Sequence, residues 1–586
     1  MLKWFGVGGL LALAALAIGS GAPALAASSS DARAQVRTMF DIYTKMRDGV
    51  ELASDVWLPA QPGRYPIILI RTPYLKAMPE ISFPSYGRYF AQHGYAFVVQ
   101  DVRGRGDSGG QFDFFFQEAD DGYDTIEGLA KLPWSNGRVC MMGISYLGTV
   151  QWLAAKEQPP HLVCMAPSSP GARFMDELPY LGGAFGMRWA LSWLNGTSGK
   201  INQDPNTEGL DWDRIFAHRP LLTMDEAMGR KMPLYREFLQ HDTLDAYWRR
   251  IRLGPEDFAK INIPILDMTG TFDGDQLGAL YVWSGVERYA PASRSNRFLI
   301  IGPWQHVQTF LGGALNQGEF KLSPDSVLDV KKIDLEFFDR YLKQDASVKL
   351  GPRVRVYVTG RDVWRSFDEF PPRIAKSQRL FFSSGGHANT GCGDGKLSWA
   401  KPKGPSADEF TYDPKNPAHV LEPYAGVDRR PIEQRHDVLV YTSEPLKQPV
   451  EVIGPVTVEL YAASDALDTD FTANIVDVFP DGRAAGLGPD PVGILRARYR
   501  HGLEKTELLH PGKVTIFRID LGSIAHSFQP GHRIRIEISS SAYPFFNPNQ
   551  NTGNPVATDT DWKVAHQKIM HTSRWPSAVV LPVVTP

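Results

Sequence analysis

Nearly continuous apolar runs alternate with amphipathic segments in the first part of the chain. The runs, which have the composition of strands buried on both faces of a sheet, span 65–71, 95–101, 139–143 and 161–166. The segments with apolar side chains at helical spacing span 86–93, 118–129 and 146–156. This alternation predicts a parallel sheet covered by helices. Ahead of it, residues 36–57 hold two alternating runs separated by Asp48-Gly49, which predicts an antiparallel hairpin.

The middle of the chain departs from this alternation of strands and helices and then returns to it. Residues 170–260 carry Trp, Met and Leu at helical spacing without a convincing buried strand, so we expect a helical cap inserted over the sheet. Residues 263–269 and 297–302 restore the strand pattern, and 330–343 predicts an amphipathic helix that closes the domain. We therefore assign a single α/β domain to residues 36–169 and 261–346.

Beyond about residue 350 the dominant period changes from helical to alternating. Short strand-like runs with turns between them span 354–358, 377–382, 438–441, 456–462, 472–478, 513–520 and 532–540. Because helical periods are scarce here, residues 350–586 are predicted to form an all-β domain, most simply a sandwich or a jelly roll.

The N-terminal residues 1–26 have the pattern of a secretory signal peptide. Lys3 supplies a positive charge, residues 10–18 are apolar, and Ala24-Leu25-Ala26 provides the small residues of a cleavage site. The alternative is a transmembrane anchor, but the apolar run is shorter than a bilayer requires. We expect an exported protein, periplasmic or secreted, without a stable membrane anchor.

Composition narrows the class of partner. The net charge is -3 and no basic block stands out, which argues against nucleic acid because phosphate binding needs concentrated Lys and Arg. The three cysteines, Cys140, Cys164 and Cys392, are too few for a disulfide framework. Cys140 and Cys164 lie in strand-like runs that could be neighbours, and we favour buried free thiols over a disulfide.

A serine stands at the turn between the third buried run and the helix that follows it. The segment Gly143-Ile144-Ser145-Tyr146-Leu147-Gly148 fits a nucleophile elbow, in which a tight turn points the serine hydroxyl at the mouth of the sheet. The usual pattern is G-x-S-x-G, whereas here the second glycine comes one residue later. The alternative is a strand–helix turn without chemistry. We favour Ser145 as a nucleophile.

A serine nucleophile needs a base, and the base needs an acid that orients it. Asp273 follows the predicted strand at 263–269, and His306 follows the one at 297–302. Carboxyl ends of parallel strands meet at one edge of a sheet, where Ser145 should also emerge. The chain order Ser, Asp, His is the order of α/β-hydrolases. The other histidines lack this placement.

At this point the chain resembles the family of cocaine esterase, X-prolyl dipeptidyl peptidase and α-amino acid ester hydrolase, the CocE/NonD-type serine hydrolases. The motifs that carry the resemblance are RTPY at 71–74, DVRGRGDSGG at 101–110, PWSNG at 133–137, GISYLG at 143–148 and GPW at 302–304. In the β region, PGHRIR at 530–535 and FFN at 545–547 also match. Arg103, Arg105 and Asp107 are interpreted as fixing a loop through ion pairs and turns.

The resemblance implies a fold, a mechanism and a set of residues. The fold is an α/β-hydrolase with a helical cap, followed by a jelly roll of the galactose-binding-like kind. Ser145 would be the nucleophile, His306 the general base and Asp273 its orienting acid. The oxyanion hole would consist of the backbone N–H of Tyr146 and the phenolic O–H of Tyr74. Neither a metal nor a cofactor is expected, since no cluster has metal-ligand spacing.

The resemblance implies a secreted serine hydrolase that cleaves carboxylic esters, extending to amides, through an acyl-enzyme intermediate. The substrate is expected to be a small-molecule ester or a short peptide-like compound. Family members that act on α-amino acid esters hold the substrate ammonium with carboxylates. Here Asp275 is retained, Gln276 stands where a second acid is expected, and Asp176 or Glu177 are candidates to supply one. The alternative is that these are solvated loop charges.

Two other functions stay open at this stage. The first is an X-prolyl dipeptidyl peptidase, which also needs an acidic anchor for a free N-terminus. The second is a non-catalytic protein whose β domain binds polysaccharide. The sequence leaves the oligomeric state open, a homo-oligomer included.

Overall fold

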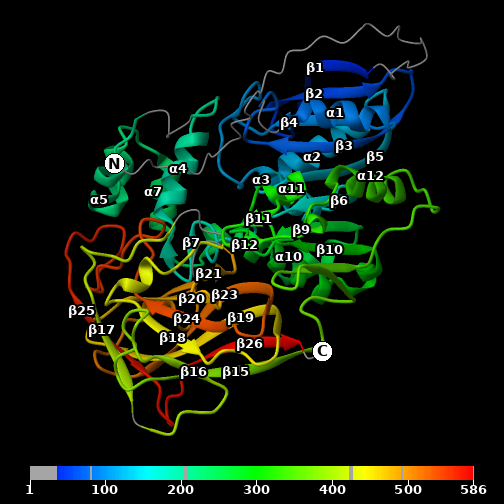
Figure 1. Ribbon diagram of the computed structural model, residues 1–586. Coiled ribbons are helices and arrows are strands. Elements are labelled where there is room, and N and C mark those ends of the chain that lie inside the picture. Colours follow the sequence, from blue (N-terminus) through cyan, green and yellow to red (C-terminus); the bar gives the residue numbers. More distant parts are fainter. Residues whose placement is uncertain are drawn as a thin grey trace, which may run out of the picture.

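The computed structural model describes residues 36–78, 82–203, 209–404, 406–421, 426–489 and 493–584. The predicted signal peptide lies outside the described residues. Figure 1 shows a helix-covered sheet coloured blue to green and, next to it, a β-rich part coloured yellow to red. Three helices of the inserted segment stand beside the blue sheet and above the β-rich part: α4 (Met187–Thr197), α5 (Trp212–Ala217) and α7 (Pro233–Gln240).

The first sheet has ten strands in the order β1-β2-β4-β3-β5-β6-β9-β10-β13-β14. Their bounds are β1 Val36–Lys45, β2 Glu51–Pro59, β3 Tyr65–Thr72, β4 Ala96–Asp101, β5 Ser135–Ile144, β6 Leu162–Ser168, β9 Ile265–Gly270, β10 Arg297–Gly302, β13 Val354–Val358 and β14 Val363–Phe367. The strands from β4 to β13 run parallel, and β1, β2 and β14 pair antiparallel. The predicted hairpin of β1 and β2 is confirmed.

One strand prediction is wrong in its partner. Residues 354–358 form a strand as expected, but β13 pairs in parallel with β10 of the first sheet instead of joining the β-rich part. Its alternating valines fit the face of either sheet equally well, so local pattern carries no information on the partner. The side chains of Val354 and Val356 lie in a buried cluster with Leu299 and Ile301 of β10.

Helices cover this sheet because their apolar positions lie on one side. The helices of this part of the chain are α1 Phe83–Gln92, α2 Glu118–Ala130, α3 Tyr146–Lys156, α10 Gln276–Tyr289, α11 Gln308–Leu311 and α12 Val330–Tyr341. Helix α1 packs on β2 and β4, α3 on β5 and β6, and α10 on β9. Among the described residues, no helix has the length and apolarity needed to span a membrane.

The predicted insertion is helical, with one short hairpin. Besides α4, α5 and α7 it contains β7 Tyr180–Leu181, β8 Ala184–Phe185, α6 Met224–Ala227, α8 Ala246–Arg249 and α9 Pro255–Lys260. Backbone bonds fasten the hairpin to the β-rich part: Arg496 N donates to Gly182 O at 2.8 Å, and Asn547 N donates to Phe185 O at 3.0 Å. The Arg496 guanidinium is itself paired with Asp470 and buried.

The β-rich part is built on a second sheet of twelve strands. Its strands are β15 Ala375–Ser383, β16 Lys396–Ser398, β17 Ala407–Tyr412, β18 Leu439–Ser443, β19 Val450–Ser464, β20 Asp470–Val478, β21 Ala484–Leu487, β22 Gly493–Arg496, β23 Thr515–Phe528, β24 Arg533–Ser539, β25 Ala565–Met570 and β26 Ala578–Val584. All pairings of long strands within it are antiparallel. Six of the seven predicted runs correspond to β15, β18, β19, β20, β23 and β24.

The cysteines agree with the interpretation as free thiols. Cys140 on β5 and Cys164 on β6 lie opposite each other in register and are buried, and both are free, as is the exposed Cys392.

Candidate active site

Ser145 occupies a strained backbone conformation between β5 and α3. Its φ is 61° and its ψ is −125°, a region that side-chain-bearing residues rarely adopt and that costs on the order of 1–3 kcal/mol. The turn is held by Ser145 N donating to Ser168 O of β6 at 2.9 Å and by Gly148 N donating to Ser145 O at 2.8 Å. Such strain persists where the surroundings impose it, and it is the expected geometry of a nucleophile elbow.

The position of the second glycine has a steric reason. A Cβ at Gly148 would stand 2.8 Å from Ser168 O, where α3 crosses the end of β6. At Gly143, which has a φ of 140°, a Cβ would stand 2.5 Å from the Cβ of Leu147. The close approach that the elbow needs is therefore made at 143 and 148, and Leu147 fills the space that Gly143 leaves.

Asp273 and His306 form a hydrogen-bonded pair just beyond two adjacent strands. Asp273 Oδ1 lies 2.8 Å from His306 Nδ1. The carboxylate follows β9, is fully buried and also accepts the backbone N–H of Asp275 at 2.9 Å. The histidine follows β10 and keeps about a third of its side chain exposed. The strands β5, β6, β9 and β10 are consecutive in the sheet, which brings Ser145, Asp273 and His306 to one edge.

A second carboxylate faces the other nitrogen of His306. Asp275 Oδ2 lies 3.7 Å from His306 Nε2. Burial lowers the pKa of His306, but Asp273 and Asp275 outweigh it and raise the pKa to about 9. Burial raises the pKa of Asp275 to about 7, with Asp273 adding to the rise and His306 opposing it. The two carboxylates therefore both favour the protonated imidazole.

The two remaining candidate acids, Glu177 and Asp176, have different partners in the structure. The Glu177 carboxylate accepts the backbone N–H groups of Arg173 and Gly278 at 2.9 and 2.7 Å. Burial raises the pKa of Glu177, and the nearby Asp275 raises it further. Asp176 instead pairs with the Arg173 guanidinium and accepts Gly182 N at 3.2 Å. Asp275 and Glu177 thus form an acidic pair next to His306, while Asp176 belongs to an ion pair.

Gln276, which replaces an expected acid, connects the two halves of the protein. Its Nε2 donates to Ser523 O of β23 at 2.8 Å, and Ser523 N donates to Gln276 Oε1 at 2.7 Å. An acid could not make both of these bonds as a carboxylate, because one of them requires a donor on the side chain.

Tyr74 and Tyr146 lie beside Ser145 in different ways. The Tyr74 hydroxyl interacts with the Ser145 side chain, and burial raises the pKa of this phenol to about 12 although the Trp193 and Ser145 contacts oppose the rise. The Tyr146 side chain points inward, where its hydroxyl lies within hydrogen-bonding distance of Phe114 O and Glu118 Oε1, at 2.7 and 2.8 Å. Its backbone N–H opens α3 and has no partner within the helix.

The loop after β4 is fixed by ion pairs, as its sequence suggested. Arg103 pairs with Asp121 and with Asp48, each at 2.6 Å. Lys76 pairs with Asp107 at 2.8 Å. Among the described residues, no group of three or more His, Cys, Asp and Glu side chains is arranged to hold a metal ion.

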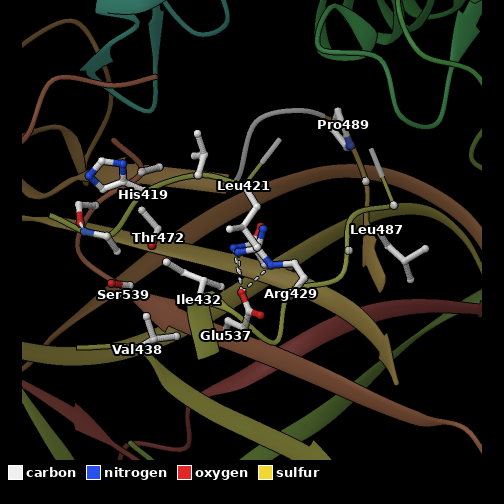
Figure 2. A pocket seen from close by; sticks show the side chains of 18 residues that line it. His419, Leu421, Arg429, Ile432, Val438, Thr472, Leu487, Pro489, Glu537 and Ser539 are labelled. Carbon is white, nitrogen blue, oxygen red and sulfur yellow. Dashed lines mark hydrogen bonds and ion pairs between the residues drawn. The ribbon is translucent and has the colours of Figure 1, made fainter. Parts of the chain in front are cut away.

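A separate recess lies in the β-rich part and contains none of the candidate site residues. Figure 2 shows Arg429 and Glu537 paired within it, and their side chains lie 2.7 Å apart at Nη2 and Oε2. The recess measures about 50 Å³, whereas small-molecule pockets typically have about 300 Å³ or more. This recess is therefore smaller than a typical small-molecule site.

Comparison with known proteins covers nearly the whole chain. Residues 48–308 match the X-Pro dipeptidyl-peptidase (S15 family) domain, and residues 346–580 match the X-Pro dipeptidyl-peptidase C-terminal non-catalytic domain. The chain is 33% identical over 581 residues to cocaine esterase from Rhodococcus sp., with 93% of this chain and 98% of the esterase covered.

Solved structures agree in architecture. An aminopeptidase from a marine sediment archaeon, Thaumarchaeota archaeon, has a TM-score of 0.83 and 25% identity, covering 97% of this chain and 99% of its own. An α-amino acid ester hydrolase has a TM-score of 0.82 and 26% identity, covering 95% and 98%. The protein thus has an α/β-hydrolase N-terminal domain and a β-rich C-terminal domain. It is a serine hydrolase and belongs to the family that contains cocaine esterase, X-Pro dipeptidyl-peptidase and α-amino acid ester hydrolase.

Proposed function

We propose that this protein is an exported carboxylic-ester hydrolase that works through an acyl-enzyme on Ser145. The observation that carries the proposal is the strained elbow at Ser145 combined with the Asp273–His306 pair at 2.8 Å, all at one edge of the sheet. A serine turn that only connected a strand to a helix could be relaxed, whereas a strained elbow that exposes the hydroxyl is typical of a nucleophile. A histidine oriented by a carboxylate at the same sheet edge supplies the base that such a nucleophile needs.

In the first half of the reaction, the Ser145 hydroxyl attacks the ester carbonyl carbon and His306 Nε2 takes the serine proton. Asp273 holds the imidazole through Nδ1 and stabilises the charge that forms. His306 then gives the proton to the leaving alkoxide, so that an alcohol departs and an acyl-serine ester remains. In the second half, water attacks this ester with the same proton transfers and releases the carboxylic acid.

The negative oxygen of each tetrahedral intermediate is proposed to bind the N–H of Tyr146 and the O–H of Tyr74. The raised pKa of Tyr74, about 12, favours this role, because the phenol keeps its proton throughout the working range. Losing one such donor typically costs about 3 kcal/mol of transition-state stabilisation.

The substrate class is proposed from the acidic pair. Asp275 and Glu177 are two partly buried carboxyl groups. Asp275 raises the pKa of Glu177, and a bound cation would relieve this repulsion. An α-amino group next to the ester carbonyl is the cation that fits beside His306. Esters with an α-ammonium group are therefore the proposed preferred substrates, and the helical insertion is proposed to cap their acyl side.

A second candidate function rests on the same pair. A free peptide N-terminus is also an ammonium group, so the acidic pair fits an X-prolyl dipeptidyl peptidase as well. The family of the matched catalytic domain agrees with this alternative. Rates on Xaa-Pro anilides and on α-amino acid esters, measured on one preparation, decide between the two: the higher kcat/KM identifies the function.

The mechanism is tested with Ser145→Ala. The variant should lose at least about 10³-fold in kcat on p-nitrophenyl esters, and labelling by a fluorophosphonate probe should disappear while the melting temperature is retained. Full activity in Ser145→Ala would refute the proposal.

Export is tested by fractionating cells that express the full chain. A mature N-terminus at Ala27 in the exported fraction is expected, and an intact protein confined to the cytoplasm would refute the proposed export.

A further inference from the structure

The hydroxyl of Tyr74 is held by a residue of the helical insertion. Trp193 of α4 places its indole Nε1 at 3.0 Å from the Tyr74 hydroxyl oxygen. An indole N–H can only donate, so the phenol oxygen accepts this bond. The phenolic hydrogen is therefore left for another acceptor. Accepting a hydrogen bond also polarises the O–H and makes it a better donor.

The main chain at Tyr74 is also hydrogen-bonded to the helical insertion. Asn202, which follows α4, donates from Nδ2 to Tyr74 O at 3.0 Å. Arg105 donates to Pro73 O and to Asn202 Oδ1, each at 2.6 Å, and to Thr197 O at 2.9 Å. The Arg105 side chain is fully buried, and its guanidinium thus ties the loop after β3 to the end of α4.

The Trp193 ring has little freedom. It stacks on Tyr146 with a centroid distance of 6.0 Å and an interplanar angle of 18°, and on Trp189 at 5.5 Å and 12°. Tyr74 meets it edge-on at 6.5 Å and 87°, an arrangement that is compatible with the bond from the indole N–H to the phenol oxygen. Trp189 has no hydrogen bond to Tyr74 among the described contacts.

We propose that Trp193 is a positioning residue for the oxyanion hole: its indole N–H orients the Tyr74 hydroxyl so that the phenolic proton points at the substrate oxygen. The inference rests on the proposed donor role of Tyr74. It gives the insertion a part in transition-state stabilisation in addition to covering the substrate.

Trp193→Phe tests this inference because it keeps an aromatic ring in the stack and removes the donor, and the loss of ring volume that comes with it is matched in the control. Without the bond the Tyr74 hydroxyl rotates more freely, and kcat should fall about tenfold with KM changed less than about threefold. Trp189→Phe is the matched control. It removes an indole N–H from the same helix and the same stack, and kcat should stay within about threefold of the unmodified protein.

A double-mutant cycle with Tyr74→Phe tests the donor role of Tyr74 separately from the positioning role of Trp193. Tyr74→Phe alone should lower kcat by about 10²-fold or more, and adding Trp193→Phe should lower it no further. If Tyr74→Phe changes kcat by less than about threefold, the donor role of Tyr74 fails. If Tyr74→Phe is impaired and Trp193→Phe is not, the positioning role fails while the donor role stands.

Two further readouts exclude a merely structural effect of Trp193→Phe. Labelling of Ser145 by a fluorophosphonate and the melting temperature should both be retained. The loss in kcat should be equal for acetyl and phenylacetyl esters, because the oxyanion is common to both. A loss that grows with the size of the acyl group, or that persists in the Tyr74→Phe background, would overturn the inference and assign Trp193 to acyl binding.

Discussion

We predict that Asp275, together with Asp273, raises the pH at which the candidate base becomes available. At 3.7 Å from His306 Nε2, a full charge would stabilise the imidazolium by about 4 kcal/mol at an effective dielectric constant of about 20, which equals about three pKa units. A discount applies, because about a third of the His306 side chain is exposed to solvent, which screens the interaction strongly. About one unit of the His306 pKa remains.

The Asp275→Asn variant should therefore lower the pKa of His306 from about 9 to about 8. A general base acts only when it is unprotonated, so the rate rises with pH through this pKa. At pH 7 the unprotonated fraction should rise from about 1% to about 10%, and kcat/KM on a neutral ester should rise about tenfold. The assay is the pH profile of kcat/KM for p-nitrophenyl acetate between about pH 5 and about pH 10, with the spontaneous rate subtracted.

Asp176→Asn is the control, because Asp176 pairs with Arg173 and not with His306. Its ascending limb should coincide with that of the unmodified protein. An α-amino acid ester should behave oppositely to the neutral ester in Asp275→Asn, with a higher KM, since the variant loses a carboxylate that the ammonium would contact. If the ascending limb of the Asp275→Asn pH profile on the neutral ester stays in place or moves to higher pH, the proposed effect of Asp275 on the His306 pKa is refuted.

Two other substitutions test the buried carboxylates. Asp273→Asn should reduce kcat by about 10³–10⁴-fold, because an amide at 2.8 Å from His306 Nδ1 favours the wrong tautomer; a loss under about tenfold in a steady-state ester assay would contradict the orienting role. Asp267 of β9 is buried with no hydrogen-bond partner for either carboxylate oxygen among the described residues, and burial raises its pKa well above the usual 3.8. Its proton is retained in the native state and lost on unfolding above about pH 4, so native stability falls as pH rises. Asp267→Asn should remove this penalty, which is at most about 4 kcal/mol at pH 7; a difference in melting temperature that is equal at about pH 4 and pH 7 would show that the carboxyl does not titrate as argued.

The sequence predicted best those features whose cause is local or follows from parallel strand order. The apolar runs identified the strands of the first sheet, and parallel order then required Ser145, Asp273 and His306 to share one edge. The antiparallel hairpin of β1 and β2 followed from alternation around Asp48-Gly49. In each case the signal lies within a few residues of the element.

Contacts between distant segments had no such signal. The strand at 354–358 was predicted, but its partner β10 was not, because valine alternation fits any half-buried strand. Asp176 and Glu177 were equivalent in sequence, and only the fold turns one toward Arg173 and the other toward Asp275. Trp193 was one of several insertion aromatics, and its bond to Tyr74 joins residues 119 positions apart.

The site is therefore built by more than the sheet that carries the triad candidates. The hairpin of β7 and β8 is bonded to the β-rich part through Arg496 and Asn547, and the chain continues directly from β8 into α4. Helix α4 then places Trp193 on the Tyr74 hydroxyl. On the other side, Gln276 directly follows Asp275, the carboxylate that faces His306, and is hydrogen-bonded to Ser523 of the β-rich part. The proposed base and the proposed oxyanion tyrosine thus each lie one short connection from the β-rich part, and we expect changes in that domain to act on the site through these two connections.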